Sequence, residues 1–208
     1  MIGILDYGVG NVRALMNLCA VNNISAAIIK DPVHLDSCSH LILPGVGHFD
    51  QAIRSLKTSA LYQPILLHVF EFNKPILGIC VGMQMMATRS DEGAADGLNW
   101  IPGTVRKFCF DDSSLPVPHM GWNNLIFEKE LEIFKNLGFA DSEFYFLHSY
   151  FYDLESSRNL AASCEYGDFF PAVIQRDNIF GMQCHPEKSH LNGINFLRNF
   201  SEYRHVTL

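Results

Sequence analysis

A cysteine set between two glycines is the clearest chemical signal in this sequence. Residues 75–79 form an apolar run with the length of a buried strand, and Cys80 follows it between Gly78 and Gly82. We expect a helix to open at Gln84. This pattern is typical of a nucleophile elbow, in which the glycines keep side chains out of a sharp strand-to-helix turn. Backbone amides at a helix start favour a thiolate, so we predict that Cys80 is a nucleophile.

A cysteine nucleophile needs a base, and the base needs a group that orients it. Among the nine histidines, His185 stands at the end of a predicted apolar strand at 179–183, separated from it by Cys184, and two residues before Glu187. Residues two apart in an extended segment point the same way, so Glu187 is expected to hold the tautomer of His185. Together with Cys80 they predict a catalytic triad for acyl transfer from an amide or ester.

Two other kinds of site compete with this interpretation. Cys80, Cys184 and His185 could be metal ligands, but in a continuing strand Cys184 would point away from His185, and no fourth ligand is evident. We therefore predict no metal and no cofactor. Residues 8–10 (GVG) follow a strand as in a nucleotide fingerprint but lack its third glycine, so we interpret them as a tight turn with Asn11 capping the next helix.

A second glycine-bearing loop follows a strand predicted at 41–43. Residues 44–48 read PGVGH, and glycines let backbone N–H groups turn toward a ligand without obstruction by side chains. An oxyanion hole requires such amides. We predict that this loop belongs to the same site as Cys80.

Composition restricts the possible partners and compartments. The chain has 208 residues, 48% of them hydrophobic, and a net charge of −7, which argues against a nucleic-acid partner. We find no run of eighteen apolar residues and no signal-peptide pattern at the start. The six scattered cysteines are typical of reduced thiols. We expect a cytoplasmic protein with no membrane segment and one domain spanning residues 1–208.

Strands and helices alternate over the first 88 residues and change character afterwards. The predicted strands there are 2–5, 25–29, 41–43 and 75–79, and the predicted helices are 12–21, 33–38, 49–56 and 61–72. This order predicts an α/β fold with a mostly parallel sheet flanked by helices, which binds ligands at the carboxyl ends of its strands. Later strands at 104–110, 144–147, 160–166, 172–176 and 179–183 predict a more antiparallel C-terminal half, closed by a helix at 192–200.

Six motifs in order carry a resemblance to a known family. They are DYGVGN at 6–11, LPGVGHF at 43–49, GICVGMQ at 78–84, PHMGWN at 118–123, FLHSY at 146–150 and HPEKS at 185–189. With them the chain resembles the class I (triad-type) glutamine amidotransferases over nearly its whole length. More narrowly, PHMGWN makes it similar to the glutaminase subunits of imidazole glycerol phosphate synthase.

This resemblance implies hydrolysis of L-glutamine through a thioester on Cys80, with His185 and Glu187 completing the triad. It places oxyanion-hole amides at Val81 and at Val46 and Gly47. The positions that match substrate-binding residues of the family are Gly45, Gln84, Glu92, His148, Ser149 and Tyr150.

The resemblance also implies a partner. Such subunits dock on a separate cyclase with a (β/α)8 barrel, forming a heterodimer that uses the ammonia to make imidazole glycerol phosphate and an aminoimidazole carboxamide ribonucleotide. The positions that match the interface are Asn11, Trp122, Tyr145 and Lys188. A closed route is needed because ammonia released into neutral water is protonated and no longer nucleophilic.

The chain departs from the family pattern at a few positions and leaves rival functions to weigh. Cys184 replaces a common phenylalanine, Val81 a common leucine, and residues 87–89 lack the usual apolar and acidic types. A related subunit that feeds ammonia to another synthase, such as one converting a sugar substituent to an amidine, therefore stays open. A non-catalytic subunit is disfavoured by the complete triad, and a cysteine peptidase by PHMGWN and HPEKS.

Overall fold

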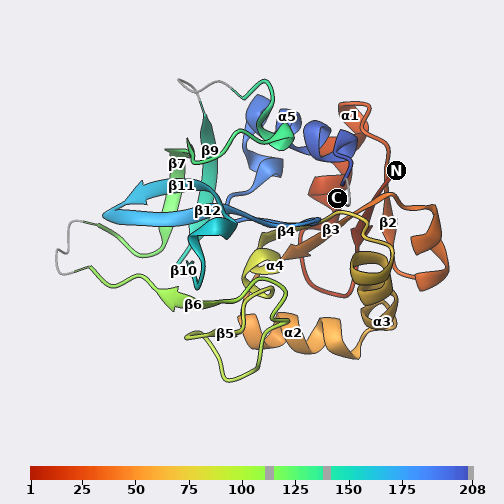
Figure 1. The fold of residues 1–208 in the computed structure, drawn as a ribbon, viewed down its shortest axis with the longest axis horizontal. Coiled ribbons are helices and arrows are strands. Elements are labelled where there is room, and N and C mark those ends of the chain that lie inside the picture. Colours follow the sequence, from red (N-terminus) through yellow and green to blue (C-terminus); the bar gives the residue numbers. More distant parts are fainter. Residues whose placement is uncertain (111–114, 138–141, 206–208) are drawn as a thin grey trace.

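The computed structural model describes residues 1–110, 115–137 and 142–205, and a large mixed sheet runs through its centre (Figure 1). The sheet order is β2 (Ala26–Ile29), β1 (Ile2–Leu5), β3 (His40–Gly45), β4 (Ile76–Cys80), β13 (Ile179–Met182), β12 (Asp168–Arg176), β11 (Leu160–Tyr166) and β8 (Ile126–Phe127). Strands β2 to β13 in this order pair in parallel, whereas β12, β11 and β8 pair antiparallel. The predicted fold class is confirmed.

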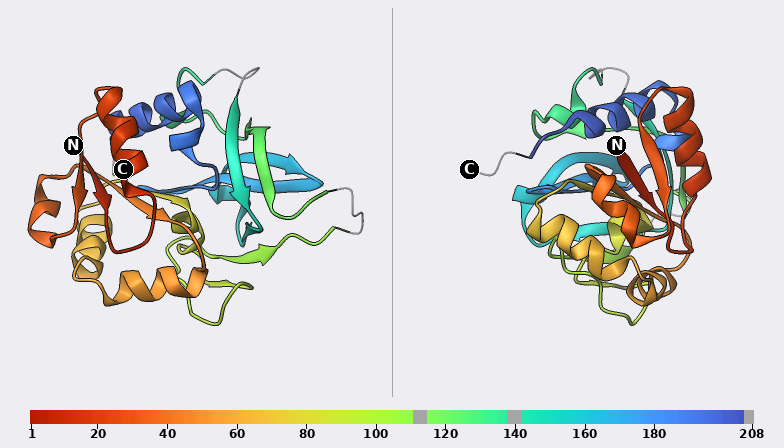
Figure 2. Two further views of the ribbon diagram at one scale, coloured as in Figure 1. Left: turned by 180° about the vertical axis from the view of Figure 1, so that it is seen from behind. Right: turned by 90° about the vertical axis from the view of Figure 1, so that its right-hand side faces the viewer.

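Helices cover both faces of the parallel part of the sheet. Helices α1 (Val12–Val21) and α5 (His190–Glu202) lie on one face, and α2 (Phe49–Thr58), α3 (Tyr62–Leu66) and the π-helical turn η2 (Leu67–Glu71) lie on the other (Figures 1 and 2). The central strands β1, β3 and β4 are buried along their whole length, as expected for a sheet covered on both sides. Aromatic side chains fill the space beneath the helices, among them Phe49, Phe196 and Phe200.

Smaller elements surround the edge of the sheet where the site lies. Strands β5 (Arg89–Ser90), β6 (Gly103–Lys107) and β10 (Tyr150–Leu154) form one small sheet, and β7 (His119–Asn124) and β9 (Glu143–His148) form an antiparallel ribbon. Helix α4 (Val81–Gln84) is a single turn. The 3₁₀ turns are η1 (Pro32–Ser37), η3 (Glu132–Phe134), η4 (Ser157–Asn159) and η5 (Pro186–Lys188).

Several local predictions were wrong in instructive ways. The helix after the elbow begins at Val81 and ends at Gln84, where we expected it to open, so few aligned peptide dipoles stand behind the thiol. Strand β3 runs on through Pro44 and Gly45, because both residues pair with β4. Asn11 precedes α1 but its side chain makes no capping hydrogen bond. Strand β10 was not predicted.

The sheet topology brings the predicted site together. Strands β3, β4 and β13 are neighbours and parallel, so their carboxyl ends meet at one edge. Gly45 pairs with Cys80 in register, and Met182 pairs with Ile79. Within the described ranges, no helix is long and apolar enough to cross a membrane.

Candidate active site

The turn between β4 and α4 holds Cys80 in a conformation that few side chains adopt. Its φ is 54° and its ψ is −114°, in a region disfavoured for residues other than glycine. The surroundings impose this turn. A Cβ atom on Gly82 would lie 1.9 Å from the carbonyl oxygen of Leu43, so only glycine lets α4 pack directly on β3. Such strain is typical of functional positions.

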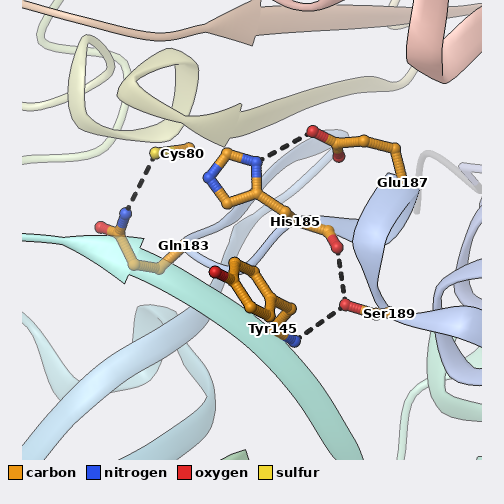
Figure 3. A network of polar contacts seen from close by, with 6 residues as sticks. All are labelled: Cys80, Tyr145, Gln183, His185, Glu187 and Ser189. Carbon is orange, nitrogen blue, oxygen red and sulfur yellow. Dashed lines mark hydrogen bonds and ion pairs between the residues drawn. The ribbon is translucent and has the colours of Figure 1, made fainter. Parts of the chain in front are cut away.

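His185 lies between the thiol and a buried carboxylate. Its Nδ1 is 3.0 Å from Oε1 of Glu187, and the two side chains are 7% and 5% exposed. The other edge of its ring faces the Cys80 sulfur (Figure 3). Burial alone would lower the pKa of His185, but the neighbouring Cys80 and the hydrogen-bonded Glu187 together outweigh it and raise this pKa to about 10. The arrangement therefore favours a proton on His185.

The contact between His185 and Glu187 was predicted, but for the wrong reason. The strand ends at Met182, and Glu187 lies in the 3₁₀ turn η5 rather than in an extended segment. The turn is tied down by Ser189, whose hydroxyl donates to the His185 carbonyl (2.6 Å) and accepts from the backbone N–H of Tyr145 (3.0 Å) (Figure 3). The His185 N–H also donates to the Tyr145 carbonyl at 2.9 Å. Strand β9 thus supports the base.

A pocket of about 370 Å³ opens over these residues, a size that suits a small ligand. It is lined by Asn11, Val46, Gly47, Cys80, Val81, Gln84, Glu92, Pro118, Leu147, His148, Ser149, Tyr150, His185, Glu187 and Lys188. Thus most of the residues singled out in the sequence border one cavity. Gly45 pairs with Cys80 beneath it, and Tyr145 contacts the lining residue Lys188 and lies next to Trp122.

The loop after β3 is anchored at both ends and open in the middle. At its start, a Cβ on Gly45 would lie 2.3 Å from the Gly82 nitrogen, so this residue is pressed against the elbow. At its end, the Phe49 N–H donates to Oε2 of Glu92 at 2.8 Å. Between them Val46 is 43% exposed and Gly47 has a φ of +83°. Glu92, predicted to hold substrate, is therefore also an anchor of this loop.

Gln84 is engaged within the protein. It is 3% exposed, and its Nε2 donates to the Tyr150 carbonyl at 3.1 Å and to Oε1 of Gln183 at 3.0 Å. The part of this side chain that can accept from a ligand is therefore Oε1. Gln183 was missed by the sequence reasoning. Its signal was a polar residue at the end of an apolar strand, two positions before the base.

Two buried histidines support the wall formed by residues 148–150. Nδ1 of His148 lies 2.8 Å from the Tyr150 carbonyl oxygen, and its Nε2 lies 3.1 Å from Nδ1 of His119. Burial lowers the pKa of His148 to about 3 and that of His119 to about 4, so both rings are neutral. His119, which lies in the PHMGWN motif, was assigned no role from the sequence.

The residues predicted to meet a partner form a group at the mouth of the pocket. The Lys188 ammonium lies 5.0 Å from the centre of the Tyr145 ring, whose centroid is 5.9 Å from that of Trp122. Trp122 is 44% exposed and stacks on His190 at 4.9 Å. Asn11 borders the same pocket as Lys188.

The structure describes all three members of the discarded metal hypothesis. Across residues 1–110, 115–137 and 142–205, no cluster of three or more histidine, cysteine, aspartate or glutamate side chains has the geometry for a metal ion. Cys184 is fully buried, which raises the pKa of its thiol well above the ordinary value.

Comparisons with known proteins agree with this architecture. The model of the Glutamine amidotransferase class-I family matches residues 4–202. Imidazole glycerol phosphate synthase subunit HisH of Leptospira interrogans is 45% identical over 97% of this chain and 99% of its own length. The protein of the same name from Bdellovibrio bacteriovorus is 42% identical over 97% and 100%. Among solved structures, PurLQS from Thermotoga maritima shares the fold with a TM-score of 0.71 and 19% identity, covering 97% of this chain and 97% of that one.

Proposed function

Because the chain belongs to the class I glutamine amidotransferase family, and within it to the HisH subunits of imidazole glycerol phosphate synthase, we propose that it is the glutaminase subunit of that synthase. It hydrolyses L-glutamine to glutamate and ammonia. A cyclase subunit then uses the ammonia to make imidazole glycerol phosphate and an aminoimidazole carboxamide ribonucleotide in histidine biosynthesis. The observation that carries the proposal is the meeting of Cys80, His185 and Glu187 in one pocket.

In the first half of the reaction, the Cys80 sulfur attacks the side-chain amide carbon of glutamine. The developing oxyanion is held by the Val81 N–H and by amides of the loop at Val46 and Gly47. His185 gives its proton to the leaving nitrogen, so that ammonia departs and a thioester remains on Cys80. Glu187 holds the imidazole in the required tautomer and stabilises its protonated form.

In the second half, water attacks the thioester. His185 takes a proton from this water, the bond to sulfur breaks, and glutamate leaves with the enzyme restored. We assign substrate binding to Gly45, Gln84, Glu92, His148, Ser149 and Tyr150, all of which border the pocket or pack directly beneath it. No cofactor is needed for this chemistry.

We propose that the partner is a separate cyclase subunit with a (β/α)8 barrel, and that it docks where Asn11, Trp122, Tyr145 and Lys188 surround the pocket mouth. Exposed aromatic and cationic side chains at that place support this assignment. Docking there would cover the pocket and keep ammonia away from water. All six cysteines are unpaired, which supports a reducing compartment such as the cytoplasm.

The test is glutamate release from glutamine by this chain in three states. The states are the chain alone, the chain with the histidine-pathway cyclase of its organism, and that complex with its ribonucleotide ligand. We expect a poor glutaminase in the first state and strong activation in the third, because ligand in the partner can select the active orientation of the oxyanion loop. Cys80→Ala should fold, dock and release no glutamate.

Two outcomes would contradict parts of this proposal. A retained glutaminase rate in Cys80→Ala would exclude Cys80 as the nucleophile. No activation by the cyclase, while a glutamine-like diazoketone still labels Cys80, would keep the amidotransferase and assign it to another synthase, such as one that makes a sugar amidine.

A further inference from the structure

A buried glutamine contacts the nucleophile from a side other than that of His185 (Figure 3). Gln183 follows the last residue of β13 and is 0% exposed. Its Nε2 donates to the Cys80 sulfur at 3.6 Å, a normal length for a bond to the large sulfur atom. Burying an amide is costly unless its polar atoms are bonded, so its contacts fix which way the amide lies.

The orientation of this amide follows from its neighbours. The Tyr150 carbonyl can only accept, so the nitrogen of Gln84 must face it, at 3.1 Å. The second hydrogen of the same nitrogen donates to Oε1 of Gln183 at 3.0 Å. The oxygen of Gln183 is thus engaged, and its nitrogen is turned toward Cys80. Exchanging oxygen and nitrogen in either amide would bring two acceptors or two donors together.

The Tyr150 carbonyl is itself held from behind. Nδ1 of His148 donates to it at 2.8 Å, which leaves Nε2 of this neutral ring as an acceptor for Nδ1–H of His119 at 3.1 Å. Nε2 of His119 then accepts from Nδ2 of Asn123 at 3.4 Å. Every hydrogen in this chain of contacts has one assignment, and none of the rings can turn without breaking a bond.

We propose that Gln183 is a further catalytic residue, whose amide N–H stabilises the Cys80 thiolate and holds its sulfur in place, oriented by Gln84 and the Tyr150 carbonyl. A hydrogen bond to an anion is stronger than one to a neutral group, so this donor favours the thiolate. The same donor assists when water breaks the thioester and the sulfur leaves as thiolate. The role in catalysis rests on the proposed function, but the effect on the thiol rests on geometry alone.

The test measures the reactivity of the thiol directly. Gln183→Met keeps the length of the side chain and removes the donor, and Gln183→Glu keeps its shape and turns an acceptor toward the sulfur. Gln175→Met is the matched control, because Gln175 lies on the neighbouring strand β12 and donates to the Asp177 carbonyl away from the pocket. Alkylation of Cys80 by iodoacetamide is followed against pH in the full chain by mass spectrometry, with the exposed Cys109 as internal reference.

We expect Gln183→Met to move the pH of half-maximal Cys80 alkylation up by about one unit, with about tenfold slower reaction at neutral pH. Gln183→Glu should move it further, whereas Gln175→Met and the reaction of Cys109 should match the wild type. The titratable groups around the thiol are His185, Glu187 and Cys184, with Glu92, His148, Tyr150 and Lys188 on the pocket wall, and all are unchanged in these variants. In the glutaminase assay the loss should fall on kcat rather than KM.

The proposal is overturned if folded Gln183→Met alkylates at Cys80 with the wild-type pH profile. If Gln183→Met shows no cooperative unfolding transition, it is not folded and Gln183→Glu is used in its place. A wild-type alkylation profile in that second variant overturns the proposal as well. A shifted profile in a chain that shows no glutaminase with any partner would support the role of Gln183 and contradict the proposed function, so the two fail separately.

Discussion

The elbow and the oxyanion loop lie side by side, yet glycine serves opposite purposes in them. At Gly82 an added Cβ would lie 1.9 Å from a backbone oxygen, whereas at Gly47 it would meet nothing within 4 Å. The first glycine lets two backbone segments touch. The second, at a φ of +83°, lets an exposed segment adopt a turn that other residues resist.

This difference shows that the elbow side of the site is fixed by the folded chain, whereas the loop at Val46 and Gly47 is less constrained. The proposed nucleophile Cys80, its proposed base His185 and Gln183 are buried at the ends of β4 and β13 and beside β9, so their geometry is set by the folding of the chain. Val46 and Gly47 are exposed, between Gly45, which is pressed against the elbow, and His48, which caps helix α2. A docked partner can therefore act on the loop while the elbow stays unchanged.

The largest effect should come from adding one methyl group to the elbow. Gly82→Ala is expected to lower the free energy of unfolding by about 3 kcal/mol and to abolish glutaminase activity, because the Leu43 carbonyl cannot move without disturbing β3. Urea denaturation measures the free energy of unfolding, and glutamate release measures the glutaminase activity. A loss below about 1 kcal/mol would mean that the elbow can yield, and that the two regions do not differ in rigidity.

An intermediate effect should appear on acidification, through the histidines behind the elbow. Burial lowers the folded pKa of His119 to about 4, while its unfolded value is near 6.5. In this pH range His119 binds a proton in the unfolded chain but not in the folded chain. The free energy of unfolding therefore decreases as pH falls from about 6.5 toward 4, by about 1.4 kcal/mol per pH unit. His119→Phe keeps the stacking on Phe146 and Tyr166 and removes the contribution of His119 to the pH dependence of stability.

The measurement is the free energy of unfolding at pH 7.5 and pH 5. The wild type should lose about 1–2 kcal/mol more over this interval than His119→Phe. Parallel losses in the two proteins would show that His119 takes up a proton in the folded state and cannot hold the hydrogen-bond directions described above.

The smallest effect on stability should come from the oxyanion loop. Gly47→Ala is expected to cost about 1 kcal/mol, because a φ of +83° strains alanine although the added methyl group meets no neighbour. Its effect should appear instead in the ratio of glutaminase rates with and without ligand-loaded partner. A stability loss as large as that of Gly82→Ala would contradict the contrast between the two regions.

The sequence alone determined the parts of this protein that depend on residues close together in the chain. The Gly78–Cys80–Gly82 spacing, the PGVGH loop, the pair His185 and Glu187, and the order of strands and helices all follow from local pattern. Even there the length of α4 was misjudged, because the carbonyls of Met85 and Met86 accept hydrogen bonds from Leu98 and Trp100 instead of continuing the helix.

Only the tertiary structure decided the hydrogen-bond chain that reaches the thiol. Gln84 meets residues 66 and 99 positions away in the sequence, and Gln183 meets Cys80 across 103 positions. Buried amides and histidines take the direction that satisfies every neighbour, and those neighbours come from α4, β7, β9, β10 and the residue after β13. The sequence contains all of these residues, but only the pairing of the strands brings them close enough to form the hydrogen bonds that give them their roles.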